Sequence, residues 1–304
     1  MTIKCSKGKC NNPAIVYQKY SGLHLCEAHF VEDVERKVKK AIRKQLMVER
    51  GDKIAVALSG GKDSSALLYM LKKIFYPRND LEFIAITVDE GINGFRSKTL
   101  RNAENIAKKL KVDIFIFSFE QEFGFTLDEI AARGFEQAPC TFCGVLRRKV
   151  IDTKARELGT TKVATAHNLD DEVQTVLINY IRGDIERLER MRGGRKEFVP
   201  RIKPLRGVPE KEVALYALVA GIAIGTVHCP YAELSFRFTV KKMLNEFERK
   251  HPGTKYSIMR GYERLSEFLP TTAPPEGKLL RCERCGAPSA TRICKACEII
   301  GKMK

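Results

Sequence analysis

The sequence predicts an α/β protein with a central parallel sheet, helices on both faces of that sheet, and a cysteine-rich module at each end of the chain. Between residues 53 and 180, short apolar runs of strand length alternate with longer stretches of helical periodicity. Such alternation is typical of βαβ units, whose parallel strands are buried beneath helices on both sides. The ten cysteines fall into three groups, one near each end of the chain and one in the middle.

Composition and charge narrow the function classes. The chain has 304 residues, no apolar stretch long enough to cross a membrane, and an N-terminus without the apolar core of a signal peptide. We therefore expect a cytoplasmic protein that does not bind membranes. A formal net charge of +17 favours a nucleic-acid partner over a merely basic, soluble surface. In the cytosol, ten cysteines indicate metal or redox chemistry before structural disulfides.

The chain divides into four predicted segments, namely an N-terminal cysteine module, a basic helix, the α/β domain and a C-terminal cysteine ribbon, at residues 1–32, 33–50, 51–270 and 271–304. A proline-rich linker (PTTAPPE, residues 270–276) precedes the last of them.

The elements follow from periodicity. An apolar helical face runs through residues 31–50, and a basic helix is expected to begin near Val145. Residues 183–206 show little periodicity and are predicted to form a mobile basic loop. In the α/β domain we expect strands at 53–59, 82–89, 112–119 and 162–167, and helices at 63–75, 97–110 and 169–180.

The strongest single motif is Ser59-Gly60-Gly61-Lys62-Asp63-Ser64, directly after the first buried strand. Glycines at this position let backbone N–H groups converge on a phosphate at the N-terminus of the following helix. Lys62 adds a point charge, whereas Asp63 fits only if it orders the loop or helps to hold a cation. The spacing matches neither a Walker loop nor a dinucleotide fingerprint. An ordinary glycine turn with a helix cap is the alternative.

A second motif, His167-Asn168-Leu169-Asp170-Asp171-Glu172, follows the fourth strand. Carboxylates at the carboxyl end of a strand can hold Mg²⁺ across phosphates. The alternative is simple helix capping by Asn168 or Asp170 with His167 merely packed. Its position beside the glycine loop favours the functional interpretation.

Three central cysteines, Cys140, Cys143 and Cys229, have no fourth thiolate nearby in the sequence. Three thiolates suit a [4Fe–4S] cluster with one open iron better than a closed zinc site, which needs four protein ligands. The alternative is a redox-active pair, Cys140 and Cys143, that carries sulfur as a persulfide or disulfide.

Both ends of the chain carry four soft ligands, and each set is predicted to hold one structural Zn²⁺. The C-terminal pair of C-x₂-C motifs predicts a tetrahedral S₄ site, and the N-terminal set predicts a Cys₃His site. The x₄ gap between Cys5 and Cys10 is wider than the usual x₂, which makes Cys5 the least secure member of its set. The ligands are Cys5, Cys10, Cys26 and His29 at one end, and Cys282, Cys285, Cys294 and Cys297 at the other.

Two basic stretches strengthen the nucleic-acid prediction, because phosphate contacts by Lys and Arg confer affinity. One lies on the predicted basic helix and the other in the predicted loop: Lys37, Lys39, Lys40, Arg43 and Lys44; and Arg182, Arg187, Arg190, Arg192, Arg195, Lys196, Arg201, Lys203 and Arg206.

The motif SGGKDS resembles the PP-loop of the ATP-pyrophosphatase superfamily, whose members cleave ATP between the α and β phosphates. The order of motifs over nearly the whole chain is similar to that of the TtcA/TtuA group of tRNA thiolation enzymes. The TtcA branch is expected to have a second C-x₂-C motif where this chain has the single Cys229, so the sequence resembles the TtuA branch. The resemblance implies catalytic roles for Asp63, Arg147, Asp171, Cys140, Cys143 and Cys229. It implies ATP contacts at Ala57, Ser59, Gly60, Gly61, Lys62, Asp63, Ser64, Val88, Ala166 and Asp171.

The activity that this resemblance implies is ATP-dependent tRNA 2-thiolation. With Mg²⁺ as cofactor, ATP would adenylate the C2 oxygen of a uridine, and sulfide held at a [4Fe–4S] cluster would displace AMP. Sulfur would arrive as the thiocarboxylate of a ubiquitin-like carrier protein, and the enzyme would be a homodimer. Few glutamines and no tryptophan suggest a hyperthermophile composition, which favours 5-methyluridine 54 of the T loop over wobble uridine 34. The rival of another class is a non-catalytic zinc-ribbon protein that binds tRNA.

Overall fold

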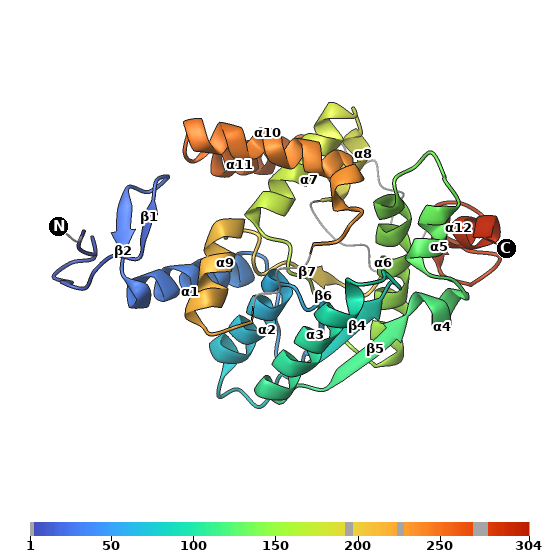
Figure 1. Ribbon diagram of the computed structural model, residues 1–304, viewed down its shortest axis with the longest axis horizontal. Helices are drawn as coiled ribbons and strands as arrows, with labels where there is room; N and C mark the ends of the chain where they lie inside the picture. Colours follow the sequence, from blue (N-terminus) through green and yellow to red (C-terminus); the bar gives the residue numbers. More distant parts are fainter. Residues whose placement is uncertain (1–2, 192–196, 224–227, 270–278, 304) are drawn as a thin grey trace.

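A five-stranded parallel sheet lies at the centre of the molecule (Figure 1). The structure is a computed structural model that describes residues 3–191, 197–223, 228–269 and 279–303. The strand order is β5-β4-β3-β6-β7, and every neighbouring pair is parallel. The strands are β3 (Lys53–Ala57), β4 (Glu82–Asp89), β5 (Ile114–Ser118), β6 (Lys162–Ala164) and β7 (Arg201–Ile202).

Alternate residues of the strands face different helices. Ile54 and Val56 belong to the core that contains Leu67 of α2 (Lys62–Phe75), whereas Ala55 packs with Ala155 of α6 (Pro139–Glu157). Helix α3 (Arg96–Leu110) covers the same face as α2. The predicted fold class, a parallel sheet with helices on both faces, is therefore confirmed.

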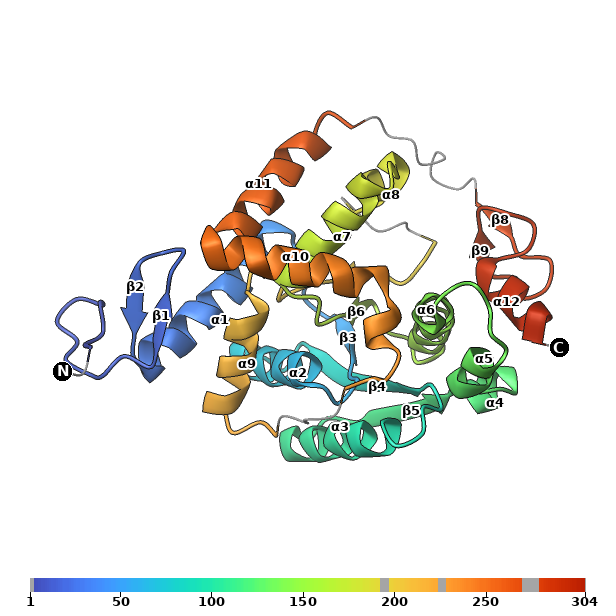
Figure 2. The same cartoon turned by 45° about the horizontal axis from the view of Figure 1, so that its top comes forward.

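Further helices lie outside these layers. Helices α1 (Glu27–Lys44) and α9 (Glu210–Val219) pack together and against α2. Helices α7 (Leu169–Ile181), α10 (Phe236–Lys250) and α11 (Thr254–Ser266) form a separate apolar cluster above the sheet (Figure 2). The short connecting helices are α4 (Phe119–Phe123), α5 (Leu127–Ala132), α8 (Ile185–Arg190) and the 3-10 turn η1 (Ala232–Leu234).

The two cysteine modules lie at opposite ends of the long axis (Figure 1). The N-terminal module contains the hairpin β1 (Val16–Gln18) and β2 (Leu23–Leu25). The C-terminal module contains β8 (Leu280–Arg281), β9 (Pro288–Ser289) and α12 (Lys295–Met303), and α12 packs on α6.

A polar cluster holds the N-terminal module on the core. The buried Gln18 amide donates to Asp33 at 2.9 Å and to Glu212 of α9 at 3.0 Å. Lys37 of α1 pairs with the same Glu212 carboxylate at 2.7 Å. The module is thus tied to both α1 and α9.

Most predicted elements match the observed ones, and the differences have local causes. Strand β4 has the predicted bounds, and α2, α3 and α7 differ from prediction by one residue at one end. The basic helix starts earlier, at Glu27, because Cys26 takes the N-cap position and Phe30 already packs in the core. Helix α6 also starts earlier than Val145, because Pro139 occupies its first turn.

The predicted loop at residues 183–206 is wrong in part. Asp184 caps the short helix α8 by accepting the N–H of Arg187 at 3.0 Å, and Leu188 is buried. Strand β7 extends the sheet within the same stretch. Arg192, Arg195 and Lys196, and the linker at 270–276, lie outside the described residues. No helix in the described part of the chain is long and apolar enough to cross a membrane.

Candidate active site and metal centres

The conformation of the glycine loop between β3 and α2 depends on Gly60 and on hydrogen bonds made by Ser64. Gly60 has φ +79°, and a Cβ at this position would lie 1.8 Å from the Thr99 carbonyl oxygen of α3. Only glycine therefore fits. The Ser64 hydroxyl accepts the Ser59 N–H and donates to the Gly61 carbonyl oxygen, each at 3.1 Å. Gly61 caps α2 without any side-chain bond, so the first N–H groups of α2 are available to an anion.

The residues predicted to contact ATP lie along one edge of the sheet. Ala57 and Val88 are at the carboxyl ends of β3 and β4, and Ala166 follows the end of β6. These three strands are neighbours in the sheet. Ligands of open α/β sheets bind at this edge.

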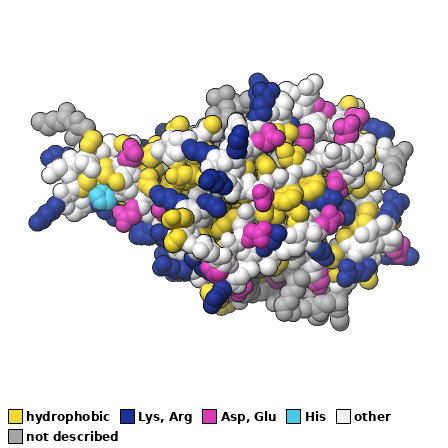
Figure 3. Space-filling model, turned by 90° about the horizontal axis from the view of Figure 1, so that it is seen from below, with side chains coloured by type: hydrophobic (Ala, Val, Ile, Leu, Met, Phe, Trp, Pro, Cys, Tyr) yellow, Lys and Arg dark blue, Asp and Glu magenta, His cyan; other side chains and the backbone are white. Residues whose placement is uncertain are grey.

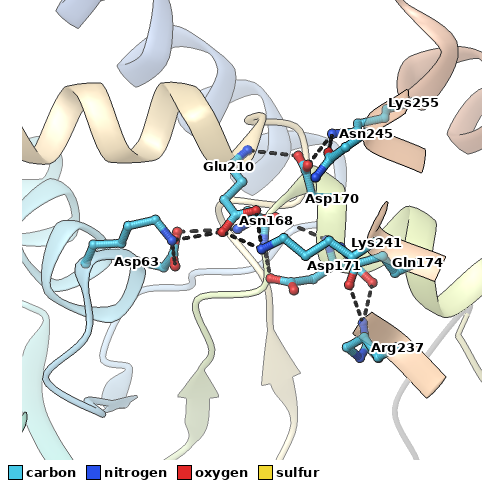
Figure 4. A network of polar contacts seen from close by, with 11 residues as sticks. Asp63, Asn168, Asp170, Asp171, Gln174, Glu210, Arg237, Lys241, Asn245 and Lys255 are labelled. Atoms are coloured by element: carbon cyan, nitrogen blue, oxygen red, sulfur yellow. Dashed lines mark hydrogen bonds and ion pairs between the residues drawn. The ribbon is translucent and has the colours of Figure 1, made fainter. Parts of the chain in front are cut away.

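A charged network crosses the mouth of the glycine loop (Figure 4). The Lys62 ammonium lies 2.9 Å from Asp63 and 3.0 Å from Glu210 at the start of α9. Glu210 also pairs with Lys241 of α10 at 2.8 Å. The Asn168 amide donates to the other Asp63 oxygen at 3.3 Å. The charge of Lys62 is thus already engaged by two carboxylates, one of which the sequence did not reveal.

Asp171 takes part in capping α7, and its carboxylate also lies near that of Asp63. Its carboxylate accepts the Asn168 N–H while the Asn168 side chain accepts the Asp171 N–H, each at 3.1 Å, so both residues form a capping box for α7. Burial, together with the neighbouring Asp63 carboxylate, raises the pKa of Asp171 to about 6. A second carboxylate beside Asp63 gives this edge the oxygen ligands that a divalent cation prefers.

A buried ion pair links the glycine loop to α6. Arg96 and Glu90 are each 4% exposed, and their side chains approach to 2.8 Å. The Arg96 guanidinium also donates to the Ser59 carbonyl oxygen at 3.0 Å and to that of Val88. Glu90 in turn accepts from Arg147 of α6 at 3.2 Å. Sequence reasoning missed Arg96 and Glu90, although both follow β4 closely.

The three central cysteines approach one another from two segments. Cys140 and Cys143 lie in the first turns of α6, and Cys229 precedes η1. The Cys140 thiol donates to the Tyr231 carbonyl oxygen at 3.2 Å. Cys143, Cys229 and Tyr231 pack against one apolar cluster, and burial raises the pKa of Cys143 to about 12. The sulfurs do not crowd within 4.8 Å as the terminal ligand sets do in the described chain.

Both terminal sets converge as the sequence predicted. In each set, one ligand atom from every residue lies within 4.8 Å of the others. His29 Nδ1 lies 3.4 Å from the Cys5 sulfur and 3.3 Å from the Cys26 sulfur, so Cys5 is an equal member of its set. None of the ten cysteines, all of which lie in the described part of the chain, forms a disulfide. These sets have the ligand number and type of structural zinc sites.

The C-terminal set also has a contact outside its module. The Cys294 N–H donates to the Cys282 sulfur at 3.2 Å and lowers the pKa of that thiol to about 6. Lys149 of α6 donates to the Cys285 sulfur at 3.2 Å. Helix α6 therefore carries two central cysteines and a lysine that contacts the terminal set.

Two family models match the chain. The model described as a PP-loop domain matches residues 30–224. The model described as the N-terminal LIM domain of the 2-thiouridine synthetase TtuA matches residues 4–31. Together they cover the glycine loop, Cys140, Cys143 and the N-terminal ligand set.

Relatives match nearly the whole chain. A probable sulfurtransferase of Methanocaldococcus jannaschii is 40% identical and covers 97% of this chain and 87% of its own length. The tRNA 2-thiolation protein NcsA of Haloferax volcanii is 38% identical, covering 96% of this chain and 97% of its own. The solved structure of the U34-tRNA thiolase NcsA of Methanococcus maripaludis with its [4Fe-4S] cluster is 38% identical, with a TM-score of 0.84 and coverage of 99% and 96%.

Proposed function

The chain belongs to the PP-loop family of tRNA 2-thiolation enzymes, and from this premise we propose which residues perform the two halves of its reaction and which uridine it modifies. It is a sulfurtransferase that uses ATP. The observation that carries the proposal is the chain of contacts from the glycine loop through Arg96 and Glu90 to Arg147, which lies on α6 four residues after Cys143. A non-catalytic tRNA-binding role is set aside.

The first half is adenylation at the glycine loop. The uridine C2 oxygen attacks the α-phosphorus of ATP, and the bond to the β-phosphate oxygen breaks to release pyrophosphate. The free N–H groups at the start of α2 would stabilise the departing pyrophosphate, and Lys62 would exchange a carboxylate partner for a phosphate. Asp63 and Asp171 would hold Mg²⁺, because their carboxylates are already linked through Asn168.

The second half replaces oxygen by sulfur at the central cysteines. Cys140, Cys143 and Cys229 would hold a [4Fe–4S] cluster, since three thiolates that stand farther apart than the ligands of a single ion suit separate irons of one cluster. When bound, such a cluster supplies an iron with an open position for sulfide. Arg147 would position the adenylated base between the glycine loop and the cysteines. AMP leaves as the C2–S bond forms.

The persulfide relay remains the alternative for this half, and the iron content of matched variants distinguishes the two. Protein purified without oxygen should hold iron and thiolate tRNA, and Cys140→Ala, Cys143→Ala and Cys229→Ala should each lose both properties. AMP formation should survive in all three variants, because the glycine loop is unchanged. Full thiolation by iron-free protein, or by the Cys229→Ala variant, would overturn the cluster assignment.

The proposed target is wobble uridine 34. The Methanococcus maripaludis structure, which this chain matches over 99% of its length, is of a U34-tRNA thiolase. The match of residues 4–31 to a TtuA domain keeps 5-methyluridine 54 as the second candidate. Mapping 2-thiouridine in tRNA from a deletion strain decides between them, since loss at position 54 alone would refute the wobble assignment.

The sulfur donor and assembly stay as the sequence predicted. A ubiquitin-like carrier with a C-terminal thiocarboxylate is the proposed donor, and a homodimer is the proposed assembly. Replacing the carrier by inorganic sulfide in a defined thiolation assay tests the first, because undiminished turnover would make the carrier dispensable. Sedimentation velocity tests the second.

A further inference from the structure

A basic groove lies between α1 and α11, and its lining includes none of the residues proposed above for adenylation or sulfur transfer. Its volume is about 840 Å³. Tyr20 and Tyr256 form part of its wall, with ring centroids 4.8 Å apart. Six Lys and Arg side chains and a single carboxylate, that of Glu263, line it: Arg36, Lys37, Lys40, Lys44, Arg206 and Arg260.

The charge of the groove is only partly neutralised. Glu263 pairs with Lys44 at 2.9 Å and approaches Arg206 to 3.6 Å. Arg36 and Lys37 pair with Asp33, which lies outside the lining. Lys40 and Arg260 are exposed and form no ion pair with any residue that the structure describes, although Arg260 donates to the Ser257 hydroxyl at 3.1 Å. The groove therefore keeps an excess of positive charge facing solvent.

The spacing on α1 makes this excess costly for the isolated helix. Arg36, Lys40 and Lys44 follow one another at i, i+4 and i+8 and so lie on one face. Like charges at this spacing destabilise a helix by a few tenths of a kcal/mol per pair. The adjacent hollow on α1 is lined by Lys39 and Arg43, which extend this positive stripe, and by the carboxylates Glu32 and Glu35. A polyanion lying along the stripe would remove the repulsion.

The net positive charge of the protein does not by itself distinguish this groove from the rest of the surface. Seen from below, Lys and Arg side chains are spread along the molecule with acidic side chains scattered among them (Figure 3). What distinguishes the groove is that its walls concentrate cations around one carboxylate.

The groove adjoins the catalytic edge. Leu169, Arg206 and Gly207 belong to its lining. The residue before Leu169 is Asn168, whose amide bonds to Asp63 in the glycine loop. The lining of the groove thus includes the chain neighbour of a residue that contacts the glycine loop.

We propose that this groove binds the sugar–phosphate backbone of the tRNA substrate, with Lys40 and Arg260 as phosphate contacts on opposite walls. The proposal rests on the tRNA 2-thiolation activity and assigns to it a binding surface outside the catalytic edge. The aromatic pair would support the ribose or a base, while affinity comes from the cations.

The test is the salt dependence of tRNA binding. The double variant Lys40→Gln/Arg260→Gln should bind unmodified tRNA about tenfold more weakly near physiological salt, and the slope of log K against log salt should fall by about 1 to 2, as expected for two lost phosphate contacts. The matched control is Arg101→Gln/Lys108→Gln on α3, which removes the same charges from exposed side chains outside the groove.

Equal slopes for the groove variant and the wild type would overturn the proposal, as would equal losses in the groove variant and the control. Normal tRNA binding with loss of self-association in sedimentation would instead assign the groove to a second copy of the chain. AMP formation by the wild type tests the proposed function separately, so failure of one does not disguise failure of the other.

Discussion

The terminal and central cysteine sites are built from the same side chain but differ in geometry. In each terminal set four ligand atoms lie within 4.8 Å of one another, close enough for all four to coordinate a single ion. The central three are not drawn together in this way. The Cys140 thiol instead donates to the Tyr231 carbonyl oxygen, and Arg147, four residues after Cys143 on α6, contacts Glu90. A complete ligand set stabilises a segment that is too small for its own core, whereas an incomplete set leaves a position for chemistry.

The largest effect expected from this difference is on thiolation. Cys143→Ala should reduce thiolation by about a hundredfold or more, as removal of a group that acts in a reaction does. Its melting temperature should change little, because the thiol is only partly buried. By contrast, Cys297→Ala should release α12 from its module and lower zinc content while iron persists. Metal analysis and hydrogen exchange of α12 check both; a variant of Cys297 that loses iron but keeps zinc would contradict the division.

A smaller effect on activity is expected at Arg96, which together with Glu90 links the glycine loop to α6. Arg96→Lys keeps the charge beside Glu90, but a single ammonium cannot reach the Ser59 and Val88 carbonyl oxygens as a planar guanidinium does. We expect kcat for AMP formation to fall about ten- to a hundredfold, in keeping with the cost of small misplacements in active sites. Thr99→Val, which removes one bond to Arg96, is the milder control. An unchanged kcat with lowered stability would reduce Arg96 to a structural role.

The next prediction concerns the C-terminal ligand set, which Lys149 of α6 contacts from outside its module. Lys149→Met removes the donor to the Cys285 sulfur and should weaken zinc binding about tenfold, as loss of a hydrogen bond to a metal ligand does. Lys154→Met on the same helix is the control, because Lys154 pairs with Glu122 and Glu157 and does not contact a cysteine. Zinc release to a chromogenic chelator measures the difference. Identical release from both variants would show that Lys149 does not support the site.

The smallest effect concerns the carboxylates at the open edge. Because the pKa of Asp171 is raised to about 6 in the folded state, its neutral form stabilises the fold at low pH, and that stability is lost as the pH rises from about 4 through 6. Asp171→Asn should abolish this dependence and raise stability at pH 7 by about 1 kcal/mol after allowance for solvent screening. Denaturant titrations at pH 4 and pH 7 measure it. Mg²⁺ with ATP should stabilise the wild type more than the variant, which keeps the glycine loop but lacks one carboxylate. Equal stabilisation would remove Asp171 from the proposed cation site.

Local signals in the sequence were sufficient to predict the motifs, but they were not sufficient to predict long-range packing. The glycine loop and the spacing of the terminal cysteines each depend on residues close in the chain, so pattern and turn chemistry predicted them. Capping of α7 by Asn168 was only the alternative interpretation of its motif, although it too is local. Glu210, by contrast, reaches Lys62 across 148 residues, because α9 packs on α2. Nothing near Lys62 in the sequence signals that contact.

The same distinction applies to buried charges. Lys255 of α11 meets Asp170 across 85 residues, and the pair depends on the packing of α7 with α11. Single-sequence periodicity shows that α7 has an apolar face, but it does not show which helix covers that face. Partners such as Lys255 and Lys241 therefore become visible only in the folded structure.

Gly60 contributes to the site only through its backbone geometry, because it has no side chain that could bind or react. Alanine at this position would place a methyl group 1.8 Å from the Thr99 carbonyl oxygen, yet every donor, charge and thiol of the site would still be present. Only glycine therefore fits at position 60. During evolution another residue can be accepted there only if α3 first moves away from the loop. A homologue with another residue at position 60 would therefore be a marker of lost ATP chemistry, even with all its cysteines intact.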